Sequence, residues 1–328
     1  MSLSTTQVPR AFREDFVRTG YRAPNLTAKQ CLASLFECHN ETANVWTHLI
    51  PTLFFAALAV QCAVVDEKPR AWPMVVFVAG LVVNTGCSTV AHLFSTMSVR
   101  SRHICYYIDY SGISIVGLTV SIGYYYYSFP LGGVALRNRY ISGSVFVGAL
   151  ACFLSCGSRH YRVDAWQKSA RTASFGLCYA YTTLPLLIRI AWADRWEFIL
   201  VGHVAHVALM IAASFVYTAK VPERFWPGRF DLFGHSHCLM HILFDFSILL
   251  QFVCVRFDME NREGMTQWPV PTYNELLLPL FMLIAMNFTI IWYFISRMSP
   301  RKERGAKSFE KRRKRLSSWQ EHFNFRAM

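Results

Sequence analysis

Charged residues are scarce in this chain. Asp, Glu, Lys and Arg together make up 16% of its 328 residues, whereas hydrophobic residues make up 53%. Soluble globular domains carry about 25% charged residues. This balance excludes an ordinary soluble domain and indicates an integral membrane protein.

The chain also lacks the marks of a secreted, disulfide-bonded protein. Its ten cysteines are scattered through apolar runs and the N-terminal segment, with no paired spacing in the outer loops, which argues against a disulfide framework. Residues 1–44 contain no continuous apolar stretch of the kind that precedes a signal cleavage site. We therefore expect the first membrane span to act as its own insertion signal.

Long apolar runs are abundant, and each is close to the roughly 20 residues that a helix needs to cross the hydrocarbon core. The runs cover 45–65, 73–97, 104–128, 141–157, 172–193, 198–218, 237–256 and 274–296. They predict an all-α integral membrane protein, built as a bundle of eight transmembrane helices. The expected division is a cytoplasmic N-terminal segment at 1–44, a seven-helix core at 45–256, an outer loop with the eighth helix at 257–296, and a basic cytoplasmic tail at 297–328.

Lys and Arg residues are distributed unevenly between the two sides of this bundle. With eight spans, 25 of the 33 fall on the side that holds both termini, and eleven of these belong to the tail from residue 297 onward. Because cytoplasmic loops carry the excess of positive charge, both termini are expected in the cytoplasm. If the last run did not cross, the tail would move to the other side and the excess would disappear, which favours eight spans over seven.

Several polar residues fall at one depth of the predicted bundle, near its cytoplasmic side. His237 and His241 begin the seventh span and are four residues apart, so both leave the same face of a helix. The second span ends at Met97, so His92 and Ser88, which lies one turn before it, fall in its cytoplasmic third. Asp109 lies about 8 Å in from the same side on the third span, at 1.5 Å per residue.

Two interpretations of these residues remain open at this point. In the first, His92, His237 and His241 bind zinc, Asp109 is a fourth ligand or the base that holds a bound water, and Ser88 is a hydrogen-bonding neighbour. Such a set suits zinc, which favours three or four nitrogen, sulfur or oxygen ligands. In the second, neutral histidines and Asp109 form a hydrogen-bonded network, since ionisable groups inside a bilayer usually face one another.

Motifs along two thirds of the chain carry a resemblance to a known family. They are Gly20-Tyr21-Arg22, Ser34-Leu35-Phe36, Asn40-Glu41-Thr42-Ala43-Asn44-Val45-Trp46-Thr47-His48, Ser88-x3-His92, His103-Ile104-Cys105-Tyr106-Tyr107-Ile108-Asp109-Tyr110, Pro222-Glu223-Arg224, Pro227-Gly228-Arg229-Phe230-Asp231 and Ser236-His237-x3-His241. In this order they resemble the progestin and adipoQ receptor (PAQR) family, most of all its membrane progestin receptor branch. Eight spans also fit this branch, whereas the adiponectin-receptor relatives have seven.

The resemblance implies a zinc ion held by His92, His237 and His241 with Asp109 close by, in a fold shared with alkaline ceramidase-like hydrolases. For this branch it also implies a plasma-membrane receptor that binds progesterone or another steroid or lipid and signals rapidly through heterotrimeric G proteins. The alternative is a zinc-dependent hydrolase of ceramide-like lipid amides, in which Asp109 would act as general base and Ser88 would assist the oxyanion.

Some residues depart from the family pattern or cannot be assigned from it. Cys238 stands where the family usually has Gln. Asp245 lies one turn beyond His241 on the same face, and it is either a neighbour of the metal centre, a contact to a ligand's polar end, or a carboxylate bonded to another helix. Glu41 is expected to cap the first helix.

Three further features receive structural interpretations. His203 and His206 lie at the outer end of the sixth span, at the wrong depth to join the zinc site, and are expected to be structural. Tyr124 to Tyr127 fall at the outer end of the third span, where aromatic belts are common. The basic tail is expected to contact anionic lipids of the inner leaflet rather than nucleic acid.

Overall fold

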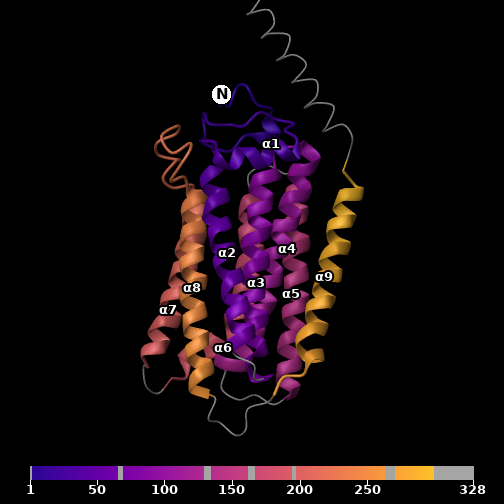
Figure 1. Ribbon diagram of the computed structural model, residues 1–328, viewed down its shortest axis with the longest axis vertical. Coiled ribbons are helices and arrows are strands. Elements are labelled where there is room, and N and C mark those ends of the chain that lie inside the picture. Colours follow the sequence, from indigo (N-terminus) through magenta and orange to yellow (C-terminus); the bar gives the residue numbers. More distant parts are fainter. Residues whose placement is uncertain are drawn as a thin grey trace, which may run out of the picture.

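A bundle of long helices makes up the molecule in this computed structural model, which describes residues 2–65, 69–128, 134–161, 167–193, 197–262 and 270–298. Figure 1 shows the long helices side by side, with the N-terminal segment at one end of the bundle. Their bounds are α2 Thr42–Val65, α3 Trp72–Phe94, α4 Val99–Gly123, α5 Val134–His160, α6 Gln167–Ala191, α7 Phe198–Ala219, α8 Ser236–Arg262 and α9 Tyr273–Ser296. The short helix α1 spans Ala28–Ala33.

The prediction of an all-α bundle with eight long helices is confirmed. Seven of these helices are long and apolar enough to cross a membrane. The eighth, α4, is less apolar because it carries polar residues such as Arg102 and Asp109. It packs against α3, α5 and α9, so its polar side chains find protein partners inside the bundle, where a bilayer offers none.

The helices begin close to the residues where the apolar runs begin. Thr272 caps α9, and its side chain and that of Glu275 satisfy each other's backbone N–H groups in a capping box. Ser98 caps α4 by accepting a hydrogen bond from the Ser101 backbone N–H. α4 therefore starts five residues before the predicted position, since the polar first turn is helical but not apolar.

The four consecutive tyrosines do not form an aromatic belt at the lipid surface. Tyr124, Tyr125, Tyr126 and Tyr127 continue α4 as one turn of π-helix, and each is at most 7% exposed. Their hydroxyls are used inside the protein: Tyr127 donates to the Arg70 carbonyl. The prediction was wrong because position along a helix gives the depth of a residue but not the direction it faces.

The N-terminal segment folds over the end of the bundle where α3 ends and α8 begins (Figure 1). Asp231, between α7 and α8, accepts hydrogen bonds from the backbone N–H groups of Arg18 and Thr19 and from the Thr19 hydroxyl. Gly20 has a φ of 83°, and a Cβ there would lie 2.6 Å from Leu232. Only glycine suits this turn, which places the Gly20 carbonyl 2.8 Å from the Asn40 backbone nitrogen.

The side chain of Arg22 connects this segment to α3. Its guanidinium donates to the backbone carbonyls of His92 and Leu93, at 2.6 and 2.9 Å. These carbonyls belong to the last turn of α3, where the helix leaves them without partners of its own. The segment is therefore bonded directly to the last turn of a membrane helix.

His39 sets a pH dependence for this end of the molecule. Its Nδ1 accepts from the Glu41 backbone N–H at 3.1 Å, and its Nε2 donates to the Ser34 carbonyl at 3.0 Å. Only the neutral ring satisfies both bonds. Burial lowers the pKa of His39 to about 4, and the nearby charge of Arg22 adds to the effect.

Stability should therefore fall as the pH drops from about 6.5 towards 4, because the unfolded chain binds a proton that the folded His39 rejects. Thermal unfolding in detergent across this range measures the effect. His39→Leu should be less stable at pH 7.5, since two hydrogen bonds are lost, yet should lose less stability on acidification. Equal pH slopes for the two proteins would contradict this role.

Candidate metal centre

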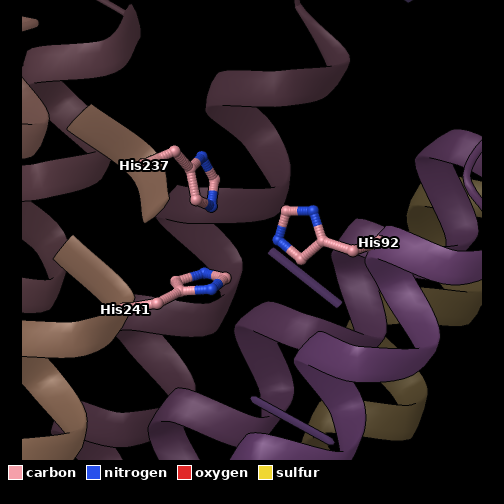
Figure 2. Close-up of side chains that lie close together, drawn as sticks. All are labelled: His92, His237 and His241. Carbon is pink, nitrogen blue, oxygen red and sulfur yellow. The ribbon is translucent and has the colours of Figure 1, made fainter. Parts of the chain in front are cut away.

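Three histidines from two helices meet inside the bundle. His92 comes from the last turn of α3, and His237 and His241 come from the first turns of α8. One nitrogen of each ring lies within 4.8 Å of the others, and Figure 2 shows the rings pointing toward one another. His92 and His241 are 1% and 2% exposed. The expectation that these residues share one depth is confirmed.

Neighbouring groups determine which nitrogen each ring offers. The carboxylate of Glu41 accepts a hydrogen bond from His92 Nδ1 at 2.8 Å, which leaves the His92 Nε2 lone pair free. Nε2 is buried and has no hydrogen-bond partner among the described residues. Thr47 donates its hydroxyl proton to the Ala43 carbonyl, so its oxygen accepts from His241 Nδ1 at 3.1 Å. A zinc-binding histidine usually has its other nitrogen bonded in this way.

The residues fit a zinc ion in kind and in number. Three neutral imidazoles are an established ligand set for zinc, and three protein ligands leave one position for water or a substrate. A buried ring nitrogen without a partner costs free energy that a bond to a metal would recover. The unpartnered His92 Nε2, in a group of three imidazoles, is thus easier to explain with a metal than without one.

Glu41 was expected to cap the first helix, but its carboxylate has a different partner. It lies against His92 and also accepts from the Asn44 side-chain amide at 2.8 Å. Burial by itself would raise the pKa of this carboxyl, but the hydrogen bonds from His92 and Asn44 and the charge of Arg102 hold it well below its ordinary value. Glu41 is therefore ionised, and a carboxylate strengthens the histidine it accepts from.

Asp109 and Ser88 lie beside the three histidines without being part of the group. The Asp109 carboxylate lies close enough to Ser88 and to His92 to interact electrostatically with both. Among the described residues, the set of candidate ligand atoms within 4.8 Å contains only the three histidines. Of the two roles predicted for Asp109, this placement favours a neighbour over a fourth ligand.

Reasoning from the sequence missed the contacts of His48, on α2. Its ring stacks on that of His241, with centroids 3.7 Å apart and planes 13° from parallel. Its Nε2 lies 3.7 Å from Asp245 Oδ1 on α8. The only signal was the presence of a histidine within the first turn of the apolar run at 45–65, because the pairing of α2 with α8 cannot be read from one sequence.

Cys238 is buried and does not join the metal-binding group. Its backbone N–H donates to His235 Nδ1 at 3.4 Å. The substitution of Cys for the usual Gln therefore leaves the three imidazoles in place.

His203 and His206 occupy a separate buried network at the far end of the bundle. His203 Nε2 donates to Asp258 at 3.0 Å, and Asp258 also accepts from Arg189 at 2.7 Å. His206 Nε2 lies 3.1 Å from the Tyr124 hydroxyl. The interpretation of this pair as structural agrees with these bonds.

A small polar pocket of about 30 Å³ opens beside the candidate metal centre. Its lining combines residues of the N-terminal segment, the α7–α8 segment and the histidine group, and includes Glu14, Asp15, Glu41, His92, Lys220, Glu223, His235 and His237. Water can therefore approach His92 and His237 from the end of the bundle that the N-terminal segment covers.

Comparison with known proteins identifies the family of this site and fold. Residues 36–252, which contain all three histidines, match the family described as haemolysin-III related. The chain belongs to the haemolysin-III-related (PAQR) family. It is 33% identical to "Membrane progestin receptor gamma-B" of Danio rerio, over 87% of this chain and 90% of the relative. It is 32% identical to "Membrane progestin receptor gamma" of Homo sapiens over 89% and 92%, and 34% identical to "Membrane progestin receptor delta" of Mus musculus over 82% of each.

Glu41 offers a direct test of the metal centre of this PAQR protein. Replacing it with Ala should weaken zinc binding by about 10- to 100-fold, because His92 loses the carboxylate that orients it. Glu41→Gln keeps a neutral hydrogen-bond acceptor for His92, so its zinc affinity should lie between that of Glu41→Ala and that of the wild type. Zinc retained against a competing chelator, quantified by mass spectrometry of the metal, is the measurement.

Glu37 provides the control, since it is exposed and only four residues away. Glu37→Ala should retain zinc as the wild type does. Wild-type zinc affinity in Glu41→Ala would show that the Glu41–His92 bond does not serve a metal.

Proposed function

We propose that this protein is a membrane receptor for progesterone or a related steroid, with a zinc site near its cytoplasmic side. The observation that carries the proposal is the similarity to proteins named membrane progestin receptors over more than four fifths of the chain. These relatives also match it in length, so the similarity extends beyond the segment with the histidines.

The proposed role of zinc in the receptor is to connect helices. Glu41, which precedes α2, and Thr47 on α2 contact the candidate ligand histidines His92 on α3 and His241 on α8. A metal bound by His92, His237 and His241 would link α3 to α8, and these two hydrogen bonds would hold α2 at the same level. A ligand that favours one packing of these helices would change the cytoplasmic surface, through which the receptor would signal by heterotrimeric G proteins.

The proposed location is the plasma membrane, with both termini in the cytoplasm, because most Lys and Arg residues fall on that side. The expected contact between anionic lipids and the basic tail concerns residues outside the described ones, apart from Arg297 and Met298.

Cys38 allows the proposed orientation to be tested. It is exposed in the N-terminal segment, whereas Cys87 is partly buried and the other eight cysteines are buried. A membrane-impermeant maleimide should label intact cells poorly and should label Cys38 once the plasma membrane is opened. Cys38→Ser should remove most of this labelling. Efficient labelling of Cys38 on intact cells would reverse the orientation.

A zinc-dependent hydrolase of lipid amides is the second candidate function, and one observation favours it. Asp109 and the neighbouring Ser88 lie beside a three-histidine group that would leave a coordination position open on a bound zinc. Zinc, when bound, would supply a Lewis acid and lower the pKa of water. In such an enzyme Asp109 would accept a proton, and Ser88 would orient its carboxylate or assist the oxyanion.

Asp109→Asn separates the two functions in purified protein that retains zinc. A receptor should bind progesterone within about threefold of wild type, because the amide has the shape of the carboxyl group and its oxygen still accepts hydrogen bonds. A hydrolase should lose at least about 100-fold in turnover, the scale of one general base. Release of sphingoid base from ceramide and saturable progesterone binding are the two measurements.

Two outcomes of these assays decide between the receptor and the hydrolase. Ceramide turnover that depends on Asp109, without saturable steroid binding, would replace the receptor by the enzyme. Steroid binding without turnover would remove the hydrolase.

A further inference from the structure

A second group of buried polar atoms lies one helical turn deeper in the bundle than the metal centre. His48 is 5% exposed, and neither of its ring nitrogens has a hydrogen-bond partner among the described residues. Asp245 Oδ1 also has none. The two side chains come from α2 and α8, which pack against each other at this level. Buried polar groups that remain unsatisfied need an explanation.

The distance between the two groups suggests what is missing. His48 Nε2 and Asp245 Oδ1 are 3.7 Å apart, too far for a direct hydrogen bond. One oxygen atom can nevertheless lie about 2.8 Å from both, which is an ordinary hydrogen-bond length. The pair is therefore spaced to share a third polar atom.

A metal ion does not account for this pair. Among the described residues, the three histidines of the metal centre are the one group of three or more candidate ligands. His48 and Asp245 would provide only two metal ligands. The adjacent His241 does not add its Nδ1, because this nitrogen is hydrogen-bonded to Thr47. Two ligands are fewer than zinc takes in protein sites.

We propose that His48 and Asp245 bind a hydroxyl group of a lipid ligand. The inference rests on the proposed function, because it assumes that a lipid enters the bundle near the metal centre. A hydroxyl donates to the carboxylate and accepts from the imidazole N–H, so it satisfies both groups at once. A ketone only accepts, and it would leave the carboxylate without a donor. The pair therefore selects hydroxylated over keto ligands.

The test compares progesterone with its 20-hydroxy analogue, which differs by a hydroxyl in place of one ketone. Wild-type protein should bind the hydroxyl form at least about tenfold more tightly, since a site built for a hydroxyl rejects the analogue lacking it. In Asp245→Leu this preference should fall to within about twofold. Most of the change should be weaker binding of the hydroxyl form.

His48→Phe supplies the second arm of the test, because it keeps a ring that can stack on His241. It should also abolish the preference for the hydroxyl form. The double variant His48→Phe, Asp245→Leu should bind this form no more weakly than either single variant, as expected for two groups that bind one atom. Zinc content should stay at the wild-type level in each variant. A preference retained in both single variants would overturn the proposal.

Stability without ligand gives a readout that does not depend on any steroid. Replacing an unsatisfied carboxyl by an apolar side chain of similar size should leave the melting temperature of Asp245→Leu equal to or above that of wild type. Asp258→Asn is the control, because Asp258 on the same helix accepts from both His203 and Arg189 and its loss should lower the melting temperature. An equal fall in Asp245→Leu would mark a structural pair and overturn the proposal.

Failure of the proposed function has a different signature. If wild-type protein binds neither steroid, the receptor proposal fails, and cholesterol and sphingosine then serve as hydroxyl-bearing probes. Binding of either probe that weakens about tenfold in Asp245→Leu would uphold the hydroxyl site. Binding of every probe that is unchanged in Asp245→Leu, or no binding at all, would overturn it.

Discussion

The hydrogen bond from His92 to Glu41 is the contact on which the interior of this end of the bundle depends. It joins α3 to the residue that precedes α2, fixes which nitrogen His92 turns toward α8, and keeps a carboxylate buried in its ionised form. Without this partner, a buried carboxylate would either take up a proton or carry an uncompensated charge. The position of Glu41 thus determines which nitrogen His92 presents to His237 and His241.

A network of ionisable side chains lies at each end of the described bundle. At one end, Glu41, Thr47 and Asp109 surround the three histidines. At the other, Asp258 joins His203 to Arg189. Between them the core is mainly aliphatic and aromatic. This division follows from the bilayer, in which a polar side chain must find its partners within the protein. It also explains why the ionisable groups at each end bond to one another: Glu41 accepts from His92, and Asp258 accepts from His203 and Arg189.

The sequence was sufficient to predict the helices and the meeting of His92 with His237 and His241. Apolar length locates a span, and distance along the span gives the depth of each residue. Depth alone could not give the direction in which a side chain points, so the four buried tyrosines were wrongly assigned to the lipid surface. Nor could it reveal which helices adjoin. Glu41 was taken for a helix cap because its nearest candidate partners in the chain are backbone N–H groups, while its actual partner is 51 residues away.

Arg22 gives the N-terminal segment a connection that extends into the membrane. The same guanidinium bonds the carbonyl of His92 and that of the next residue, and the segment around it is tied to Asp231 beside the start of α8. The two helices that provide the three imidazoles are therefore held in register by the N-terminal segment. If a metal binds the histidines, any protein that binds this segment and shifts its packing would alter the metal affinity, and the metal would alter the affinity for that protein equally.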